Sequence, residues 1–315
     1  MKRRISLFLS IILAFALIFT ACANQDAGKE PAESPAEAPV ETPVEEKDEF
    51  KSQITFSGSS TLAPVMSAIA TEFIEDNGTW DNINPDFPDK DVIIYVSAGG
   101  SGAGAKAVIE GTSDFGMLAR EIKSEEKEKI GDVNDFKLGV DALTISINPE
   151  NPLSSIKDNL SSEEILKIFS GEYKYWDEVD SSLAHEEIVV VIRDLGGGAH
   201  GVFQNAIMGD TQVREDAIQS PSMGALVTKI IENKNAIGYA SFGMVNQNEG
   251  KLIPLKVDGV EPTVETIVDG SYKISRPLIV VKKGELTPTQ KEFMDFVTSE
   301  RGSQIIEEMG YVPAN

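Results

Sequence analysis

Three short turns of this 315-residue sequence combine glycine with hydroxyl or cationic side chains, at residues 57–61, 98–104 and 193–200. Each turn comes after a stretch with strand character and before one with helical spacing. Backbone N–H groups at the start of a helix are unpaired and carry a partial positive charge of about half a unit, so they bind anions. Arg193 in the third turn adds a guanidinium, which binds an oxyanion through charge-assisted hydrogen bonds. The three turns therefore predict an oxyanion site.

The glycines of the second turn also match parts of other motifs. Residues 100–105 fit G-x-G-x-x-A, the dinucleotide fingerprint, but no acidic residue ends a clear second strand about 20 positions later. The serine-hydrolase pattern G-x-S-x-G fails because Ala103 stands where its second glycine belongs, and the chain has only two histidines. Such glycines can also simply close a tight turn. Three turns of this kind in one chain favour anion binding.

The stretches around these turns alternate between strand and helix character. Strands are predicted at residues 53–56, 91–96, 113–117, 139–147 and 188–192, and helices at 63–76, from the glycine run to 109, and at 162–169. This alternation predicts α/β layers with largely parallel sheets. In open α/β sheets the strand-to-helix turns gather at the carboxyl ends of the strands. We therefore expect the three turns to face one cleft.

The first 21 residues have the features of a signal peptide. Three cations at residues 2–4 precede an apolar run at residues 5–20, which is shorter than the ~20 residues that a spanning helix needs. Cys22, the only cysteine, follows at a position that resembles a bacterial lipobox. The resemblance implies a diacylglycerol on Cys22 and a lipid-anchored protein on the extracytoplasmic face of the cell membrane. The alternative is ordinary cleavage beside an incidental cysteine.

Composition separates this leader from the folded body. Residues 22–50 repeat proline and glutamate with little apolar content, which predicts a disordered acidic linker. The remaining chain can bury a large core, and a body of this size commonly divides into two lobes. Removal of the signal takes the formal charge from −23 to −26, because three cations and no acid leave with it. So acidic a chain repels nucleic acid, and any anion site must rely on local donors.

Several stretches of the body resemble the phosphate-binding proteins of bacterial phosphate ABC transporters. The resemblance extends over nearly the whole body, with its stretches in matching order and spacing. It rests on SGSSTLAP at 57–64, GSG at 100–102, DFGM at 114–117, IFSG at 168–171, WDEV at 176–179, AIGY at 236–239, SRPL at 275–278 and GYVP at 310–313.

The resemblance implies an α/β fold of the periplasmic-binding-protein type II class, with two lobes joined by a two-strand hinge. The hinge crossings are expected near residues 141–147 and 239–245. Residues 51–140 and 247–315 are then expected to form lobe I, and residues 141–246 lobe II. The family also implies a monomer without cofactor, metal or catalytic activity, which closes over inorganic phosphate and delivers it to ABC permease subunits.

The family's ligand shell, carried onto this chain, has gaps. Thr61 and Ser101 match hydroxyl donors and Arg193 matches an arginine, but the Gly-Ser-Gly-Thr turn that usually follows is replaced by glycines and an alanine, without hydroxyls. A further contact after residues 114–116 is also missing. The expected ligand-binding residues are Ser60, Thr61, Leu62, Ser101, Arg120, Asp141, Arg193, Gly197, Gly198 and Ala199.

Two of these positions are predicted as compensation for the lost hydroxyls. Arg120 is expected to add positive charge. Asp141 is either the acceptor for the proton of hydrogen phosphate or a solvated hinge residue, and the sequence does not separate the two. His200 is expected at the surface.

The missing hydroxyls leave other functions open. A relative adapted to another oxyanion or to a larger solute fits the same pattern, because glycine and alanine leave more room. A sensor or adhesion role outside transport also fits. A tethered hydrolase would need a nucleophile, a base and an orienting acid, and the sequence assembles no such set.

Overall fold

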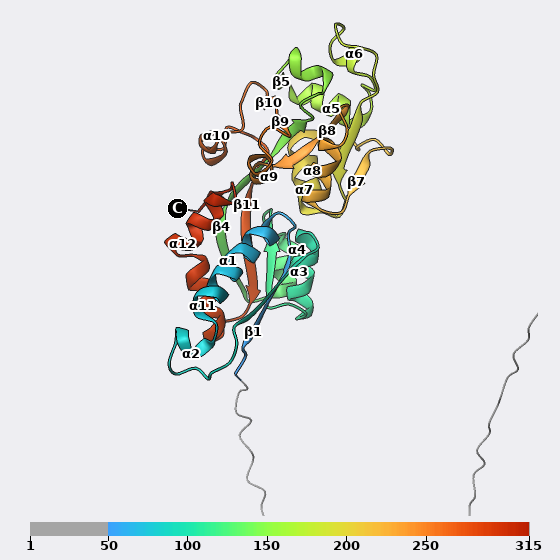
Figure 1. The fold of residues 1–315 in the computed structure, drawn as a ribbon. Helices are drawn as coiled ribbons and strands as arrows, with labels where there is room; N and C mark the ends of the chain where they lie inside the picture. Colours follow the sequence, from blue (N-terminus) through green and yellow to red (C-terminus); the bar gives the residue numbers. More distant parts are fainter. Residues whose placement is uncertain (1–49, 315) are drawn as a thin grey trace, which may run out of the picture. The chain divides into compact units, whose positions relative to one another are not determined.

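Residues 50–314 are described by the computed structural model, and within them two α/β lobes share one strand (Figure 1). The predicted signal peptide, Cys22 and the linker up to residue 49 lie outside the described residues. The predictions for that part of the chain therefore stay predictions.

Lobe I contains a sheet in which β1 pairs in parallel with β2 and β3, while β11 runs antiparallel between β3 and β4. Its elements are β1 (Gln53–Gly58), α1 (Leu62–Asn77), α2 (Trp80–Ile83), β2 (Ile93–Ala98), α3 (Ser101–Glu110), β3 (Phe115–Leu118), α4 (Ser124–Ile130), the first part of β4 (Val133–Ile147), β11 (Ser275–Lys283), α11 (Pro288–Val297), α12 (Glu300–Glu308) and β12 (Val312–Pro313).

Helices cover both faces of this sheet because its strands alternate their side chains between two cores. In β11, Leu278 and Val280 pack into the core shared with α1, α11 and α12, whereas Ile279 and Val281 pack into the core shared with α3 and α4. The near-continuous apolar run of β11 is what a strand buried on both faces requires.

Lobe II has a sheet in which β6 pairs in parallel with β7 and β8, and β8 pairs antiparallel with the second part of β4. Its elements are the 3-10 helix η1 (Pro152–Ser155), β5 (Asn159–Leu160), α5 (Ser162–Ser170), α6 (Trp176–Val179), β6 (Val189–Arg193), α7 (Gly198–Phe203), the π-helix η2 (Gln204–Met208), β7 (Ile218–Ser220), α8 (Met223–Ile231), β8 (Ala236–Ser241), α9 (Phe242–Gln247), β9 (Ile253–Pro254), β10 (Lys256–Val257) and α10 (Val264–Val268).

The 15-residue strand β4 belongs to both sheets. Ala142 pairs with Ser275 of β11, and the next residue, Leu143, pairs with Ser241 of β8. The chain thus passes from lobe I to lobe II at residues 142–143, inside the range expected for the first hinge crossing. β4 begins at Val133, six residues before the predicted start, because its polar first residues pair antiparallel with β11.

The expected return to lobe I at residue 247 differs from the structure. Leu252, Leu255 and Tyr272 are buried in the core of lobe II. β9 pairs with the end of β4, and β10 pairs with β5. The chain therefore stays with lobe II until β11 begins at Ser275. The short strands between residues 252 and 274 carry too little pattern to show this from sequence.

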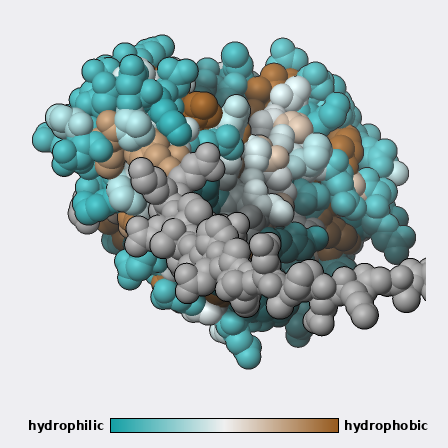
Figure 2. All heavy atoms as spheres, turned by 90° about the horizontal axis from the view of Figure 1, so that it is seen from below, coloured by the Kyte–Doolittle hydropathy of each residue, from teal (hydrophilic) through white to brown (hydrophobic). Residues whose placement is uncertain are grey.

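The exposed surface is predominantly hydrophilic in the view from below, with scattered hydrophobic residues (Figure 2). Among the residues that the structure describes, no helix combines the length and apolar character needed to cross a membrane.

Candidate functional site

The first predicted turn leads from β1 into α1 and is pressed against β3. Gly58 ends β1 with a φ of 136°, and a Cβ at this position would lie 2.3 Å from the Met117 carbonyl oxygen. Only glycine allows both this conformation and this close approach. The Ser59 hydroxyl accepts long hydrogen bonds from the backbone N–H groups of Thr61 (3.2 Å) and Leu62 (3.3 Å). The Ser59 side chain therefore holds the turn in place.

Thr61 is held by Arg276, which the sequence analysis did not assign to the site. Arg276 Nη2 donates to Thr61 Oγ1 at 3.0 Å, so the Thr61 hydroxyl proton remains available for another acceptor. Arg276 lies in β11 and is 3% exposed, and its Nε and Nη2 also donate to Asp141 Oδ2 at 2.9 and 2.7 Å. The stretch at 275–278 supported the family resemblance, but nothing in its sequence showed that it faces Thr61.

Asp141 is completely buried, so the solvated position considered for it is wrong. The backbone N–H of Phe242 donates to Asp141 Oδ1 at 3.0 Å. Burial raises the pKa of the Asp141 carboxyl above its usual value, although Arg276 opposes the rise. The backbone N–H of Ala142 also donates to this carboxylate. Asp141 thus accepts hydrogen bonds from Arg276 and from two backbone N–H groups.

The second turn places Ser101 at the start of α3. Ser101 is buried, and its hydroxyl accepts a hydrogen bond of 3.0 Å from the Ala119 N–H. The backbone N–H groups of Gly99 and Gly100 both donate to the Gly58 carbonyl, at 2.7 and 2.8 Å, and join the second turn to the first. Because Ser101 Oγ accepts from Ala119, its proton is free to point into the cleft.

The third turn fixes Arg193 by several bonds. Its Nε and Nη2 donate to Asp194 Oδ1 at 3.1 and 2.6 Å, and they also reach the carbonyls of Ser220 and Pro221. Its Nη1 donates to Ser60 Oγ of lobe I at 3.0 Å. The guanidinium is buried yet retains one Nη1 hydrogen without a partner among these contacts. Arg193 is therefore preorganised and carries a free donor.

His200 supports this turn from inside lobe II, so its expected surface position is wrong. The side chain is buried, and its Nδ1 lies 3.1 Å from Tyr239 Oη. The same Tyr239 hydroxyl accepts the backbone N–H of Arg193 at 2.9 Å. Burial lowers the pKa of His200 below its usual value, although Asp194 opposes the shift. The neutral imidazole accepts a hydrogen bond from the Tyr239 hydroxyl, which in turn holds the backbone of Arg193.

Arg120 lines a cavity of about 600 Å³ beside the third turn, together with Arg276, Gly197 and Gly198. Its guanidinium donates to both oxygens of Glu126, at 2.8 and 2.6 Å. Although burial opposes it, this pairing lowers the pKa of Glu126 and keeps the carboxylate ionised at neutral pH. The positive charge expected from Arg120 is thus largely balanced by Glu126.

The two lobes meet where Gly198 faces Ser101. A Cβ on Gly198 would lie 2.4 Å from Ser101 Oγ and 2.7 Å from Ser101 Cβ. Its neighbours Gly197 and Ala199 complete the start of α7, where helical N–H groups are unpaired. The structure thus brings together Ser60, Thr61, Ser101, Arg193 and Gly198 from three turns and two lobes.

The substitution Gly198→Ala is expected to weaken anion binding roughly 5- to 100-fold, because overpacking costs about 1–3 kcal/mol and acts here only on the closed lobes. Titration calorimetry measures the affinity, and thermal unfolding of the ligand-free protein is expected to change little. Gly201→Ala, in the same helix at a position where a Cβ meets nothing within 4 Å, is the matched control and is expected to bind as the parent does. Equal losses of affinity in the two variants would contradict the proposed contact.

The arrangement offers converging donors without a catalytic set. Hydroxyl protons of Thr61 and Ser101, one N–H of Arg193 and the N–H groups at the starts of α3 and α7 provide donors for an oxyanion. Within residues 50–314, no cluster of three or more histidine, cysteine or carboxylate side chains is placed to hold a metal ion.

Comparison with known proteins agrees with this geometry. Residues 34–301 match the family model described as a PBP superfamily domain. The phosphate-binding protein PstS of Staphylococcus aureus is 31% identical over 278 residues, covering 84% of this chain and 80% of its own length. A putative phosphate ABC transporter substrate-binding protein from Clostridium perfringens, solved with bound phosphate, is 32% identical with a TM-score of 0.72. That match covers 84% of this chain and all of the other.

A second solved structure extends the comparison. The ABC-type phosphate transport receptor from Vibrio cholerae is 26% identical with a TM-score of 0.64, over 82% of this chain and 99% of the receptor. The two-lobed fold expected from the sequence is confirmed by these matches. This chain belongs to the PBP superfamily and, within it, to the family of substrate-binding proteins of phosphate ABC transporters.

Proposed function

We propose that this protein captures inorganic phosphate between its lobes and delivers it to an ABC permease. The observation that carries the proposal is the convergence of Thr61, Ser101 and Arg193, each fixed by other bonds and each with a donor left over. Members of the family are solute-binding transport proteins and not enzymes.

Phosphate suits this cleft because donors surround it and one buried carboxylate lies beside them. We assign the role of acceptor for the phosphate proton to Asp141, which is joined through Arg276 to Thr61. Hydrogen phosphate carries a proton at neutral pH, whereas sulfate does not. Sulfate would leave the acceptor without a donor, which costs about 1–3 kcal/mol.

The lost hydroxyls of the third turn reduce the number of donors, and the backbone partly compensates. Each missing hydrogen bond to a charged ligand removes about 1.5–3 kcal/mol. The N–H groups at the start of α7 remain, and Gly198 lets lobe II approach Ser101 closely. Short distances between donors and anion strengthen each remaining bond.

The cellular setting belongs to the same proposal. A signal peptide at residues 1–21 and a lipidated Cys22 would place the protein on the outer face of the cell membrane, as a monomer on an acidic linker. Mass spectrometry of the membrane-extracted protein tests this: a diacylglycerol mass on Cys22 supports the anchor, and an unmodified cysteine contradicts it.

Titration calorimetry of refolded, phosphate-free protein tests the ligand. Phosphate and arsenate are expected to bind, and sulfate to bind about 5- to 150-fold more weakly because it leaves an unsatisfied acceptor. Thr61→Val is expected to weaken phosphate binding roughly 10- to 100-fold through loss of one hydroxyl donor. Thr71→Val, at an exposed position of α1, is the matched control. No heat from phosphate would refute the ligand, and full affinity in Thr61→Val would refute the site.

A further inference from the structure

A second cavity, of about 760 Å³, lies at the end of the lobe I strands opposite the cleft. It is lined by the start of β1, the residues before β3 and the end of β11. β1 rises about 17 Å from Gln53 to Gly58 at roughly 3.3 Å per residue, so this pocket is separated from the anion turns by the length of a strand. The two sites are therefore separate in space.

The charge of this pocket is opposite to that of the whole chain. Four of its 13 described lining residues are lysines, namely Lys51, Lys90, Lys282 and Lys283, and Asp114 is the one acid among them. The full sequence has a formal charge of −23. These clustered cations give the pocket a locally positive potential, although the protein as a whole is strongly acidic.

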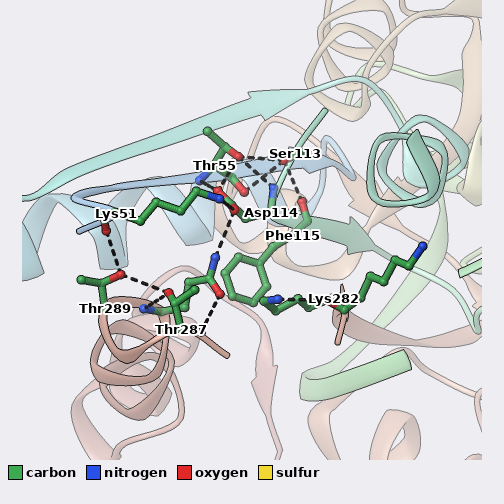
Figure 3. Close-up of polar contacts among 10 residues, drawn as sticks. Lys51, Thr55, Ser113, Asp114, Phe115, Lys282, Thr287 and Thr289 are labelled. Atoms are coloured by element: carbon green, nitrogen blue, oxygen red, sulfur yellow. Dashed lines mark hydrogen bonds and ion pairs between the residues drawn. The ribbon is translucent and has the colours of Figure 1, made fainter. Parts of the chain in front are cut away.

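Asp114 balances only part of this charge, because it is one acid against four lysines, and its own hydrogen bonds are complete. Its Oδ1 accepts from Lys51 Nζ (2.6 Å) and Gln290 Nε2 (3.0 Å), and its Oδ2 accepts from the backbone and hydroxyl of Thr55 (2.9 and 2.8 Å). Figure 3 shows Lys51, Thr55 and Ser113 gathered around this carboxylate. Asp114 neutralises one lysine and ties β1 to β3 and α11.

Lys282 is the unusual member of the group. The residue is only 9% exposed, and its ammonium donates to the carbonyl of the adjacent Lys283 at 2.9 Å. Figure 3 shows its side chain running beside Phe115. Within residues 50–314, the structure gives Lys90, Lys282 and Lys283 no ion pair. Burial lowers the pKa of Lys282 below its usual value, although the nearby carboxylates of Asp114, Glu285 and Asp132 oppose the shift.

We propose that this lysine pocket is a second anion site, which binds a phosphate-bearing group on the face of lobe I remote from the cleft. Lys282 supplies the buried charge, and Lys90 and Lys283 supply exposed charges, while Thr112 and Ser113 line the same pocket. Free phosphate and the phosphate of an anionic lipid headgroup share this chemistry. The pocket's volume of about 760 Å³ is larger than a phosphate ion needs, so both sources fit.

Backbone amide resonances of the full chain separate the two sites and the two sources. Thr112 and Lys283 report the lysine pocket, and Thr61 and Ser101 report the cleft. The probes are inorganic phosphate and a short-chain phosphatidylglycerol below its micelle concentration, with the matching phosphatidylcholine as the headgroup control. Shifts at Thr112 and Lys283 with phosphate identify a soluble anion as ligand, and shifts with phosphatidylglycerol alone identify a lipid headgroup.

The double variant Lys90→Gln/Lys283→Gln removes two exposed charges of the pocket without touching its buried lysine. It is expected to weaken the pocket's binding about 5- to 10-fold, as for exposed ion pairs, and to leave the cleft shifts unchanged. Lys127→Gln/Lys129→Gln, on exposed positions of α4, removes the same charge elsewhere and is expected to have no effect. No shift at Thr112 and Lys283 with either anion, equal shifts with phosphatidylcholine, or full binding by the pocket variant would each overturn the proposal.

Discussion

Arg193→Met is expected to weaken phosphate binding roughly 30- to 1000-fold, corresponding to about 2–4 kcal/mol. The substitution removes the buried charge and the one Nη1 donor that remains after the bonds to Asp194, Ser220, Pro221 and Ser60. It also frees the Ser60 hydroxyl, which is then held only by the Met223 N–H at 3.2 Å. Titration calorimetry measures the affinity.

Arg214→Met provides the matched control for this substitution. Arg214 lies in the same lobe, its side chain is 9% exposed, and it is paired with Asp216 away from the turns. Loss of Arg214 is expected to lower the free energy of unfolding without changing the affinity for phosphate. Similar losses of affinity in both variants would show that general damage to lobe II, and not the missing donor, explains the effect of Arg193→Met.

Asp141→Leu is expected to lower the free energy of unfolding by about 3–5 kcal/mol, because it leaves the buried Arg276 charge without its partner. Replacing both members, as Asp141→Leu/Arg276→Met, is expected to restore most of this loss, since a hydrophobic pair of similar volume needs no desolvation of charge. Urea denaturation of the two variants and the parent measures the difference.

The double variant also separates stability from function. Without Arg276 the Thr61 hydroxyl loses the donor that orients it, and without Asp141 the hydrogen-phosphate proton loses its acceptor. Phosphate affinity is therefore expected to stay low although stability returns. A double variant as unstable as Asp141→Leu would contradict the account of the ion pair. A double variant that binds phosphate normally would show that neither residue belongs to the site.

The three strand–turn–helix units were predictable because each has a local signature. A strand-like run, a cluster of glycine and hydroxyl residues and a helical period follow one another within about 20 residues, and the structure places β1–α1, β2–α3 and β6–α7 at these points. Arg193 was predicted for the same reason, since it stands at the end of its strand. The missing hydroxyls were visible directly in the sequence.

Arg276 could not be predicted as part of the site. It lies 215 positions from Thr61 in the chain and its strand reads as an ordinary apolar run, so only the antiparallel pairing of β11 with β4 brings it to Asp141. Burial of Asp141 and His200 depends on the same tertiary contacts. The lobe boundary was misplaced because β9 and β10 are two residues long and show no period.

The position of β11 has a consequence for how the chain folds. This strand lies between β3 and β4, yet it follows β4 in the sequence by more than a hundred residues, all of which build lobe II. The centre of the lobe I sheet therefore remains empty until nearly the whole chain is available, whereas lobe II is made from one continuous stretch. Contacts between distant residues form slowly, because a long loop must close first. Lobe II is thus able to nucleate early, and completion of lobe I around β11 becomes the late, slow step of folding.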